Sequence, residues 1–445
     1  MRKDSYKNYR SLCIFADSMG QRSALRTLSL LKEKEFAYFI STRFLVIFSL
    51  FMQTTVVSYL VYSLTKDPLS LGLIGLAELI PAFSMALIAG YLVDRWEKQT
   101  VYLVCIVLYV CNALFLLWIT SHFFLAAHSV KTVAWFIYAA MFLSGCIRSF
   151  LAPSSFSLLP LLISRERIQQ AVTWSSSAWL SGSVLGPLAG GLCMASIGVS
   201  YTLMMAIGAL LISVFCILRI KARPVQKVLA GSIFQGMGQG FRFIFGSQII
   251  LAVLSLDLFA VLFGGAEALL PVYSKEILQV NEIGYGWLRS AHGIGSVCLL
   301  FVLAYLPLKK KIGPKLLLSI FGFGLCIIGF GLSTNIILSF LCLFLAGMFD
   351  GVSVVIRHSI LQLKTPEEIK GRVSSINMMF ISSSNELGAF ESGATARLMG
   401  TVPAVVFGGI MTLLVVIFTK FSAPALQHIQ LADDSDKETK SEETN

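Results

Sequence analysis

The chain consists of apolar runs of about twenty residues that are separated by short polar segments. A helix of about twenty residues is long enough to cross the hydrocarbon core of a bilayer, which is about 30 Å thick. Charged residues make up only 13% of the chain, whereas a globular protein carries about 25%. The pattern predicts an all-α membrane protein with twelve transmembrane helices in two six-helix bundles, at residues 36–63, 70–93, 100–120, 132–152, 170–196, 199–219, 248–272, 284–306, 315–333, 336–357, 373–396 and 401–420.

The positions of lysine and arginine predict how these helices are oriented. Cytoplasmic loops of membrane proteins carry an excess of basic residues. If both termini are cytoplasmic, only four of the 35 basic residues fall in outer loops, namely Lys66, Lys131, Lys275 and Arg397. The net charge of +11 then follows from topology, and it gives no reason to expect a nucleic-acid partner.

The helix count and a faint internal repeat predict the domain organisation. Residues 167–172 in the loop entering helix five align with residues 368–373 entering helix eleven, as two parallel repeats would. The first residues are polar and mixed in charge, unlike a signal peptide. We predict a cytoplasmic N-terminal arm at 1–35, an N-terminal bundle at 36–219, a cytoplasmic linker at 220–247, a C-terminal bundle at 248–420 and an acidic, disordered tail at 421–445.

No pattern in the sequence predicts a cofactor or a metal site. The nine cysteines lie almost entirely within apolar runs and form no CxxC pair, and the five histidines are scattered. The linker contains the glycine-rich run Gly236-Met237-Gly238-Gln239-Gly240. A nucleotide-binding loop would need a strand before it and a helix after it. The simpler interpretation is an amphipathic linker that lies on the membrane.

Charged residues inside the predicted helices indicate a polar cavity, because each costs several kcal/mol in hydrocarbon. Helices three, six, nine and twelve carry none, which fits four lipid-facing helices around eight that line the cavity. Counting along the helices assigns one group to the outer half of the membrane: Glu78, Glu267, Arg289, Glu386 and Glu391. The inner half receives Arg43, Arg148, Asp350 and Arg357. The cavity candidates are Arg43, Glu78, Asp257, Glu267, Arg289, Asn385, Glu386 and Glu391.

Carboxylates in a low-dielectric cavity are suited to proton exchange. We therefore predict that Glu78, Glu267 or Glu386 carries a coupled proton, with Glu391 nearer the outer surface. Arg289 needs a counter-charge, for which Glu267 or Glu386 is expected. The alternative interpretation is that these charges form ion pairs that only lock the helices together.

Two motifs resemble the major facilitator superfamily of transporters. The segment Gly90-Tyr91-Leu92-Val93-Asp94-Arg95-Trp96-Glu97-Lys98 resembles the family's signature in the loop after helix two, except that Glu97 replaces a usual glycine. The resemblance implies a gate, in which Asp94 contacts the N-terminus of helix eleven and Arg148 adds a hydrogen bond. Helix five resembles the signature of proton-coupled exporters, with Gly182, Gly186, Pro187, Gly190 and Gly191. Glycines at these spacings let helices approach closely. The gating candidates are thus Gly90, Asp94, Arg95, Lys98, Arg148 and these five residues of helix five.

A third resemblance is to the enterobactin-exporter-like branch of that superfamily. It is carried by Phe263–Pro271 in helix seven, by Ser384–Gly393 in helix eleven and by the residues around Arg43 and Phe44. Ala389 stands where that branch often has an acidic residue. The likeness extends over about 36–420.

The sequence as a whole predicts a secondary transporter in the inner membrane of a bacterium. It would export a small amphipathic molecule, drug-like or siderophore-like, in exchange for protons by alternating access. The expected partners are the substrate, protons and the lipid bilayer, and we expect a monomer. The alternatives are a facilitator or importer on the same fold, or a membrane-embedded enzyme or scaffold, for which no catalytic constellation stands out.

Overall fold

The computed structural model describes residues 30–221, 233–305, 312–366 and 369–428. Every regular element in these ranges is a helix. The elements are η1 (Leu30–Lys32), α2 (Lys34–Thr65), α3 (Pro68–Arg95), α4 (Lys98–Ile119), α5 (His122–Ala127), α6 (Val130–Leu162), η2 (Arg165–Arg167), α7 (Ile168–Leu218), α8 (Ile233–Gly246), α9 (Gln248–Phe263), η3 (Ala266–Leu269), α10 (Leu270–Val272), η4 (Tyr273–Ile277), α11 (Glu282–Tyr305), α12 (Ile312–Leu332), α13 (Ile336–Lys364), α14 (Lys370–Met399), α15 (Thr401–Ser422) and η6 (Pro424–His428).

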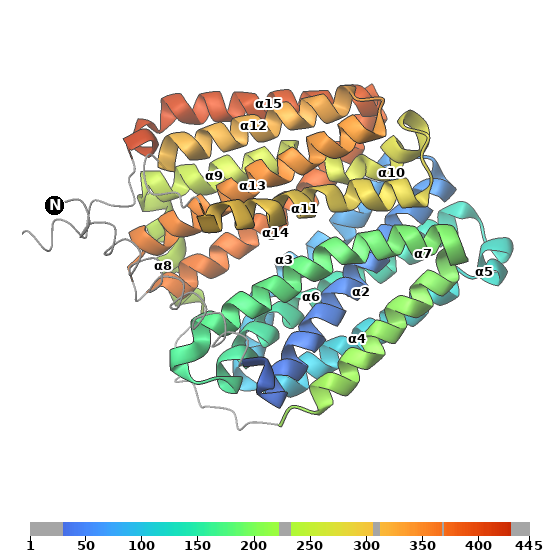
Figure 1. Ribbon diagram of the computed structural model, residues 1–445, viewed down its shortest axis with the longest axis horizontal. Coiled ribbons are helices and arrows are strands. Elements are labelled where there is room, and N and C mark those ends of the chain that lie inside the picture. The colour runs from blue at the N-terminus through green and yellow to red at the C-terminus, as the bar shows by residue number, and fades with distance from the viewer. Residues whose placement is uncertain (1–29, 222–232, 306–311, 367–368, 429–445) are drawn as a thin grey trace, which may run out of the picture.

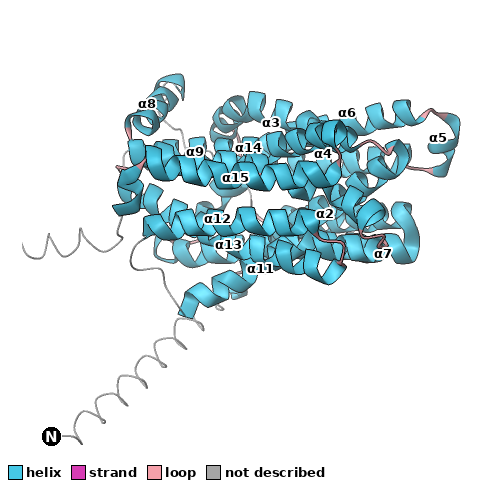
Figure 2. Ribbon diagram, turned by 90° about the horizontal axis from the view of Figure 1, so that it is seen from above, coloured by secondary structure: helices cyan, strands magenta, loops and turns pink. Residues whose placement is uncertain are grey.

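The long helices form two bundles. In the N-terminal bundle α2 packs on α7, and α6 packs on α3 and α4. In the C-terminal bundle α13 packs on α11 and α12, while α14 and α15 pack on α9. Figure 1 shows the C-terminal bundle above the N-terminal one, and Figure 2 shows only helices and connecting loops in the described part of the chain. The two bundles meet mainly through two helix pairs, α3 with α14 and α7 with α11.

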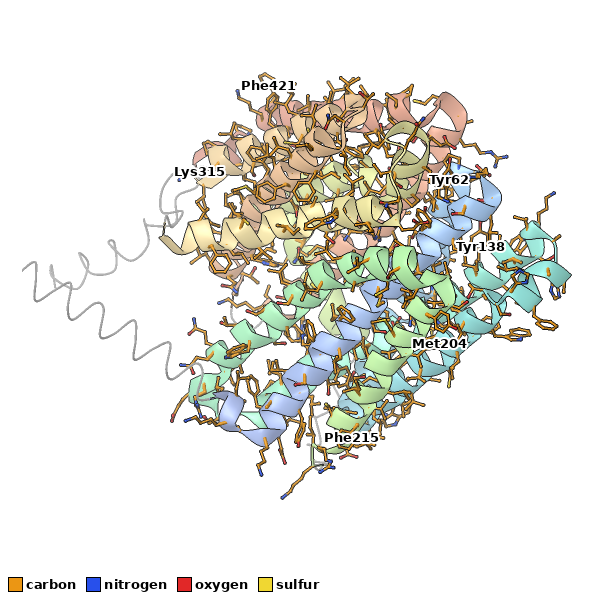
Figure 3. All side chains as sticks on the ribbon, turned by 45° about the vertical axis from the view of Figure 1, so that its right-hand side comes forward. Tyr62, Tyr138, Met204, Phe215, Lys315 and Phe421 are labelled. Atoms are coloured by element: carbon orange, nitrogen blue, oxygen red, sulfur yellow. The ribbon has the colours of Figure 1, made fainter. Side chains whose placement is uncertain are left out.

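Within the described part of the chain, ten helical segments are long and apolar enough to cross a membrane. One of them is α7, whose 51 residues contain a break at Gly198 (φ +83°), so that two helices are joined end to end. Glycine at this position has no Cβ to resist a positive φ. α14 has 30 residues but is too polar to be counted among the ten. Met204, Phe215 and Phe421 lie on the outer surface of the bundles with their side chains exposed (Figure 3), as expected for a face that contacts lipid.

Helix seven is not the single helix predicted at 248–272. α9 ends at Phe263, and the chain continues as the short elements η3, α10 and η4. A Cβ on Gly264 would lie 2.4 Å from a ring carbon of Phe323, and one on Gly265 would lie 2.9 Å from the backbone of Gly388. The two glycines thus allow the broken segment to pack closely against α12 and α14, a contact that apolar content does not reveal.

Two predicted loops are helical. α3 continues to Arg95, so Gly90 lies in its last turns and not in a loop after helix two. The glycine run 236–240 lies inside α8, and no strand precedes it among the described residues. It therefore lacks the setting of a nucleotide-binding loop. The amphipathic-linker interpretation fits the helix.

Close contacts between the bundles gather at one end of the molecule, which we call the contact end. A Cβ on Gly72 would lie 3.0 Å from the Cα of Phe390, and one on Gly393 would lie 2.9 Å from the backbone of Gly72. In Figure 1 the ribbons meet at this end, beside α10. The opposite end, the far end, holds the turn between α3 and α4, where a Cβ on Gly90 would have no atom within 4 Å.

Substitution of Gly191 would test whether the close contact between α7 and α11 at the contact end depends on small residues. A methyl group there would lie 2.5 Å from the Glu282 carbonyl oxygen and 2.7 Å from the Cα of Gly286. Overpacking of this kind costs about 1–3 kcal/mol. Because the clash is between bundles, we expect Gly191→Ala to separate the contact end and not to unfold the protein.

The measurement is labelling of Ser63→Cys with a membrane-impermeant maleimide in a cysteine-free background. Gly191→Ala should raise the labelling rate. Gly208→Ala is the matched control, because Gly208 lies on the same element with open space around its Cα. Equal labelling in both variants would show that the close approach at Gly191 is unimportant.

Candidate functional site

Arg148 on α6 bridges carboxylates of both bundles. Its Nη2 lies 2.9 Å from Oε1 of Glu386 on α14, and its Nη1 lies 3.7 Å from Oε1 of Glu78 on α3. Ser144 donates a further hydrogen bond to Glu78 at 3.1 Å. About a third of the Arg148 side chain is exposed, whereas 13% of Glu78 and 16% of Glu386 are. The charges thus meet where the two bundles touch.

Two glycines position this bridge. A Cβ on Gly145 would lie 2.3 Å from the carbonyl oxygen of Glu78, so α3 and α6 are in backbone contact one turn from Arg148. A Cβ on Gly75 would lie 3.0 Å from the carbonyl oxygen of Glu386 and 3.0 Å from the Cβ of Ala389. Larger side chains at these glycines would push the three helices apart and break the bridge.

The structure places Arg148 deeper in its helix than predicted. Helix four was expected to end near residue 152, which put Arg148 in the inner half, near Asp94. α6 continues to Leu162, so Arg148 lies near the middle of a 33-residue helix, level with carboxylates assigned to the outer half. Pro153 and Pro160 lie inside this helix, and they made the predicted end too early.

A second charged cluster lies within the C-terminal bundle. His292 on α11 has its Nδ1 3.1 Å from Oε1 of Glu267 and its Nε2 3.8 Å from Oδ2 of Asp350. Glu267 belongs to η3, directly after the break in helix seven, and Asp350 belongs to α13. A Cβ on Gly347 would lie 1.9 Å from the His292 carbonyl oxygen, so α11 and α13 touch one turn from Asp350.

The sequence analysis missed His292 because it treated the histidines as scattered. A usable signal was present, since His292 follows Arg289 by three residues and therefore shares its helix face. Asp350 was also assigned too near the inner surface. α13 extends to Lys364 and not to 357, which moves Asp350 to the middle of the helix.

Arg289 forms no ion pair with Glu267 or Glu386, its predicted counter-charges, although its charge acts on Glu386 over a longer distance. Glu267 faces His292, and Glu386 faces Arg148. The Nε of Arg289 is buried without a hydrogen-bond partner. Tyr285, one turn away on α11, is fully buried and packs its ring against Tyr59 of α2 at 5.4 Å between centroids. Arg289 therefore lies where α11 faces the N-terminal bundle.

Asp257 is not a cavity residue in this structure. It forms an ion pair with Arg357, in which the arginine side chain is 3% and the aspartate side chain 9% exposed. The pair joins α9 to α13 inside one bundle. Because protein covers both side chains, this pair fits the alternative interpretation, in which an ion pair locks helices together.

The remaining cavity candidates lie apart from these clusters. Arg43 on α2 donates from Nε to the Ser175 carbonyl oxygen at 3.1 Å and from Nη1 to the Ser155 hydroxyl at 2.5 Å. It thereby joins α2 to α6 and α7. On α14, Glu391 is half-buried and Asn385 is exposed.

The helix-five glycines lie at two interfaces. A Cβ on Gly182 would lie 2.9 Å from the backbone nitrogen of Phe48, and one on Gly186 would lie 2.7 Å from its carbonyl oxygen. One on Gly190 would lie 3.4 Å from Thr55, also on α2. Pro187 and Gly191 lie against Gly286 of α11, in the other bundle.

The motif at the end of α3 is described only in part. Lys98 donates from Nζ to the Val93 carbonyl oxygen at 2.7 Å and to that of Trp96 at 3.2 Å, so it caps the end of α3. Arg95 is exposed. The Asp94 side chain lies outside what the structure describes, so its predicted contact with helix eleven stays a prediction.

At the contact end, a group of side chains joins α2 to the segment between helices seven and eight. Tyr59 donates to Glu282 at 2.9 Å, Tyr62 to Glu276, and Lys275 to Ser63. Figure 3 shows Tyr62 at the end of α2, beside the C-terminal bundle. The Lys275 Nζ also lies 4.1 Å from the Tyr59 ring centroid. We call Tyr59, Tyr62, Ser63, Lys275, Glu276 and Glu282 the clasp.

Among the described residues, no group of three His, Cys, Asp or Glu side chains has the arrangement of a metal site. The arrangement holds charges between two helical bundles that touch at one end. Charges held between two bundles of membrane-spanning helices are typical of membrane transport proteins.

Comparisons with known proteins also indicate a membrane transport protein. A model of the Major Facilitator Superfamily matches residues 39–389, so the chain belongs to that family and is a multi-pass membrane transporter. Enterobactin exporter EntS of Escherichia coli is 25% identical over 413 residues, which cover 93% of this chain and 97% of that protein. The protein of the same name from Shigella boydii is 25% identical over 398 residues, 89% of this chain and 94% of the other. The predicted resemblance is confirmed.

Solved structures show the same fold. A peptide transporter of the POT family aligns with a TM-score of 0.71 at 13% identity, covering 89% of this chain and 95% of that one. The nucleoside transporter NupG aligns with a TM-score of 0.67 at 14% identity, covering 87% and 100%. At these identities the likeness concerns the fold alone.

The bridge makes a prediction about stability. Arg148→Met would leave two carboxylates without their cation, which costs about 3 kcal/mol for a partly exposed pair, the lower end of the range for buried ones. Adding Glu78→Gln and Glu386→Gln should recover most of this loss, because the charges are removed together. Thermal unfolding in detergent measures it.

The matched control is Arg397→Met. Arg397 pairs with Asp67 at 3.5 Å, but 57% of its side chain is exposed, so a small effect is expected. If Arg148→Met were as stable as the parent, the bridge would contribute nothing to the assembly of the two bundles.

Proposed function

We propose that this transporter exports a small amphipathic molecule in exchange for protons, across the inner membrane of a bacterium and as a monomer. The observation that carries the proposal is Arg148, which holds one carboxylate from each bundle. Proton uptake by Glu386 or Glu78 removes a negative charge from the bridge and weakens the link between the bundles. Binding of a proton can therefore change how tightly the two bundles are held together, and coupling of proton movement to a conformational change requires such an effect.

The proposed topology has twelve spans with both termini cytoplasmic. The ten segments become twelve when α7 is divided at Gly198 and α14 is added. α14 is polar because one face carries the residues that meet α3 and η3. The basic residues of the arm and of the loops at the far end favour a cytoplasmic position for that end.

With that orientation, the contact end faces outwards and the bundles are joined on the outer side. The protein is then in an inward-facing state, ready to take substrate from the cytoplasm. Export would follow when bound substrate releases the clasp and the bridge and the far end closes. Protons that the freed carboxylates take up from outside would be carried inwards on the return, and their release to the cytoplasm would let the bridge form again. The named relatives are exporters of enterobactin, which supports export and a substrate with both polar and apolar parts.

The first test is proton-driven transport. Glu386→Gln and Glu78→Gln keep the shape of the side chain but cannot ionise, so both should abolish efflux driven by a proton gradient. The assay is uptake into inverted membrane vesicles of a compound to which deletion of the gene sensitises the host. Glu166→Gln, at an exposed position before α7, is the control.

Normal proton-driven transport in both bridge variants would overturn the proposed coupling. A facilitator on the same fold would give a different result, since its flux would follow the compound's own gradient in every variant. An importer would move the compound out of inverted vesicles.

The second test concerns alternating access. Tyr62→Phe removes the hydrogen bond to Glu276, a loss of about 1 kcal/mol, which changes the ratio of states roughly five-fold towards outward-facing. Asp94→Asn removes the predicted latch at the other end and should shift the ratio the opposite way. Cysteine labelling from either side of the membrane measures both. Shifts of the same sign would contradict a two-gate cycle.

A further inference from the structure

The cluster of Glu267, His292 and Asp350 has no role in the bridge. Its three side chains come from η3, α11 and α13, all in the C-terminal bundle. Each is partly exposed, with 45% of the Glu267 side chain and 27% of the other two accessible. A small ion can therefore reach them.

The geometry of the ring decides what the cluster can bind. His292 Nδ1 faces Glu267 at 3.1 Å and Nε2 faces Asp350 at 3.8 Å. Both distances are within ion-pair range, but 3.8 Å is too long for a hydrogen bond. A neutral ring leaves the two negative charges beside it without a cation. One added proton, on the ring or on a carboxyl group, lowers the negative charge of the cluster by one.

No neighbouring basic side chain among the described residues supplies the positive charge that a proton would add to this cluster. Arg289 on the same helix has no carboxylate within ion-pair distance among the described residues, and it faces the N-terminal bundle. On α13, Arg357 is taken by Asp257, and His358 is exposed one residue further on. On α14, Glu386 is taken by Arg148. α7 contributes no titratable carboxylate, lysine, arginine or histidine to its contact with α11.

We propose that Glu267, His292 and Asp350 form a second proton-binding site, separate from the Glu78–Arg148–Glu386 bridge. The proposal rests on proton coupling as the function of this transporter. It implies that at least two protons bind per cycle, one at the bridge between the bundles and one inside the C-terminal bundle. The proton comes from water and adds to a ring nitrogen or a carboxylate oxygen, and no other bond breaks.

The experiment uses the full-length protein in proteoliposomes on a solid-supported membrane, with no substrate present. A rapid pH step drives protons onto their sites, and the transient current measures the charge displaced in the membrane. The parent should show a transient that Glu386→Gln combined with Glu78→Gln reduces and does not abolish. The charge left in this double bridge variant reports the proposed second site, because neither bridge carboxylate can then take up a proton.

Two variants test that remaining charge. In the double bridge variant, His292→Gln should abolish it. Asp350→Asn should lower it, because the amide removes one of the two negative charges that favour an added proton at the ring. His358→Gln, another histidine of the same bundle, should leave the charge unchanged. This variant also controls for histidine protonation in general.

The outcomes separate the two proposals. If His292→Gln and Asp350→Asn leave the transient of the double bridge variant intact, the second site is wrong and the bridge is unaffected. If the double bridge variant keeps the full parent transient and His292→Gln removes all of it, the bridge is not a proton site. If the parent shows no transient, both proposals fail. A transient of the double bridge variant that only the cluster variants reduce or abolish supports two sites.

Discussion

A guanidinium in the hydrocarbon layer must be matched by opposite charge, and Arg148 takes its counter-charges from α3 of its own bundle and from α14 of the other. The bundles therefore share an electrostatic contact as well as a packing contact. Gly145 and Gly75 bring the three helices close enough for it. The same arrangement makes the contact reversible, because a carboxylate can lose its charge to a proton while an arginine keeps its own.

Small residues and charges work together elsewhere in the molecule. Gly347 lets α13 touch α11 and brings Asp350 to His292. Gly264 and Gly265 break helix seven, and Glu267 follows directly after the break. Ala389 packs against Gly75 at the α3–α14 contact. An acidic side chain at residue 389 would need more room at that contact.

The buried ion pair within one bundle and the clasp between the bundles differ in how strongly they can hold helices together. The pair of Asp257 and Arg357 is covered by protein and joins α9 to α13 within one bundle. The clasp, by contrast, joins the bundles through neutral and charged hydrogen bonds near the surface, each of which contributes only about 1 kcal/mol. Weak contacts of this kind are what the proposed alternating-access cycle would need, since strong ones would trap a single state.

The sequence alone determined that this chain crosses a membrane, because runs of about twenty apolar residues have no other stable solvent. It also identified Glu78, Glu386, Glu267 and Arg148 as unusual, since charge in hydrocarbon is costly. Only the tertiary structure decided their partners. Depth counted from predicted helix ends fails when a helix such as α6 continues through its prolines, as it did for Arg148. The approach of α11 to α13, which makes His292 part of a charged cluster, depends on a backbone contact at Gly347 that no local pattern encodes.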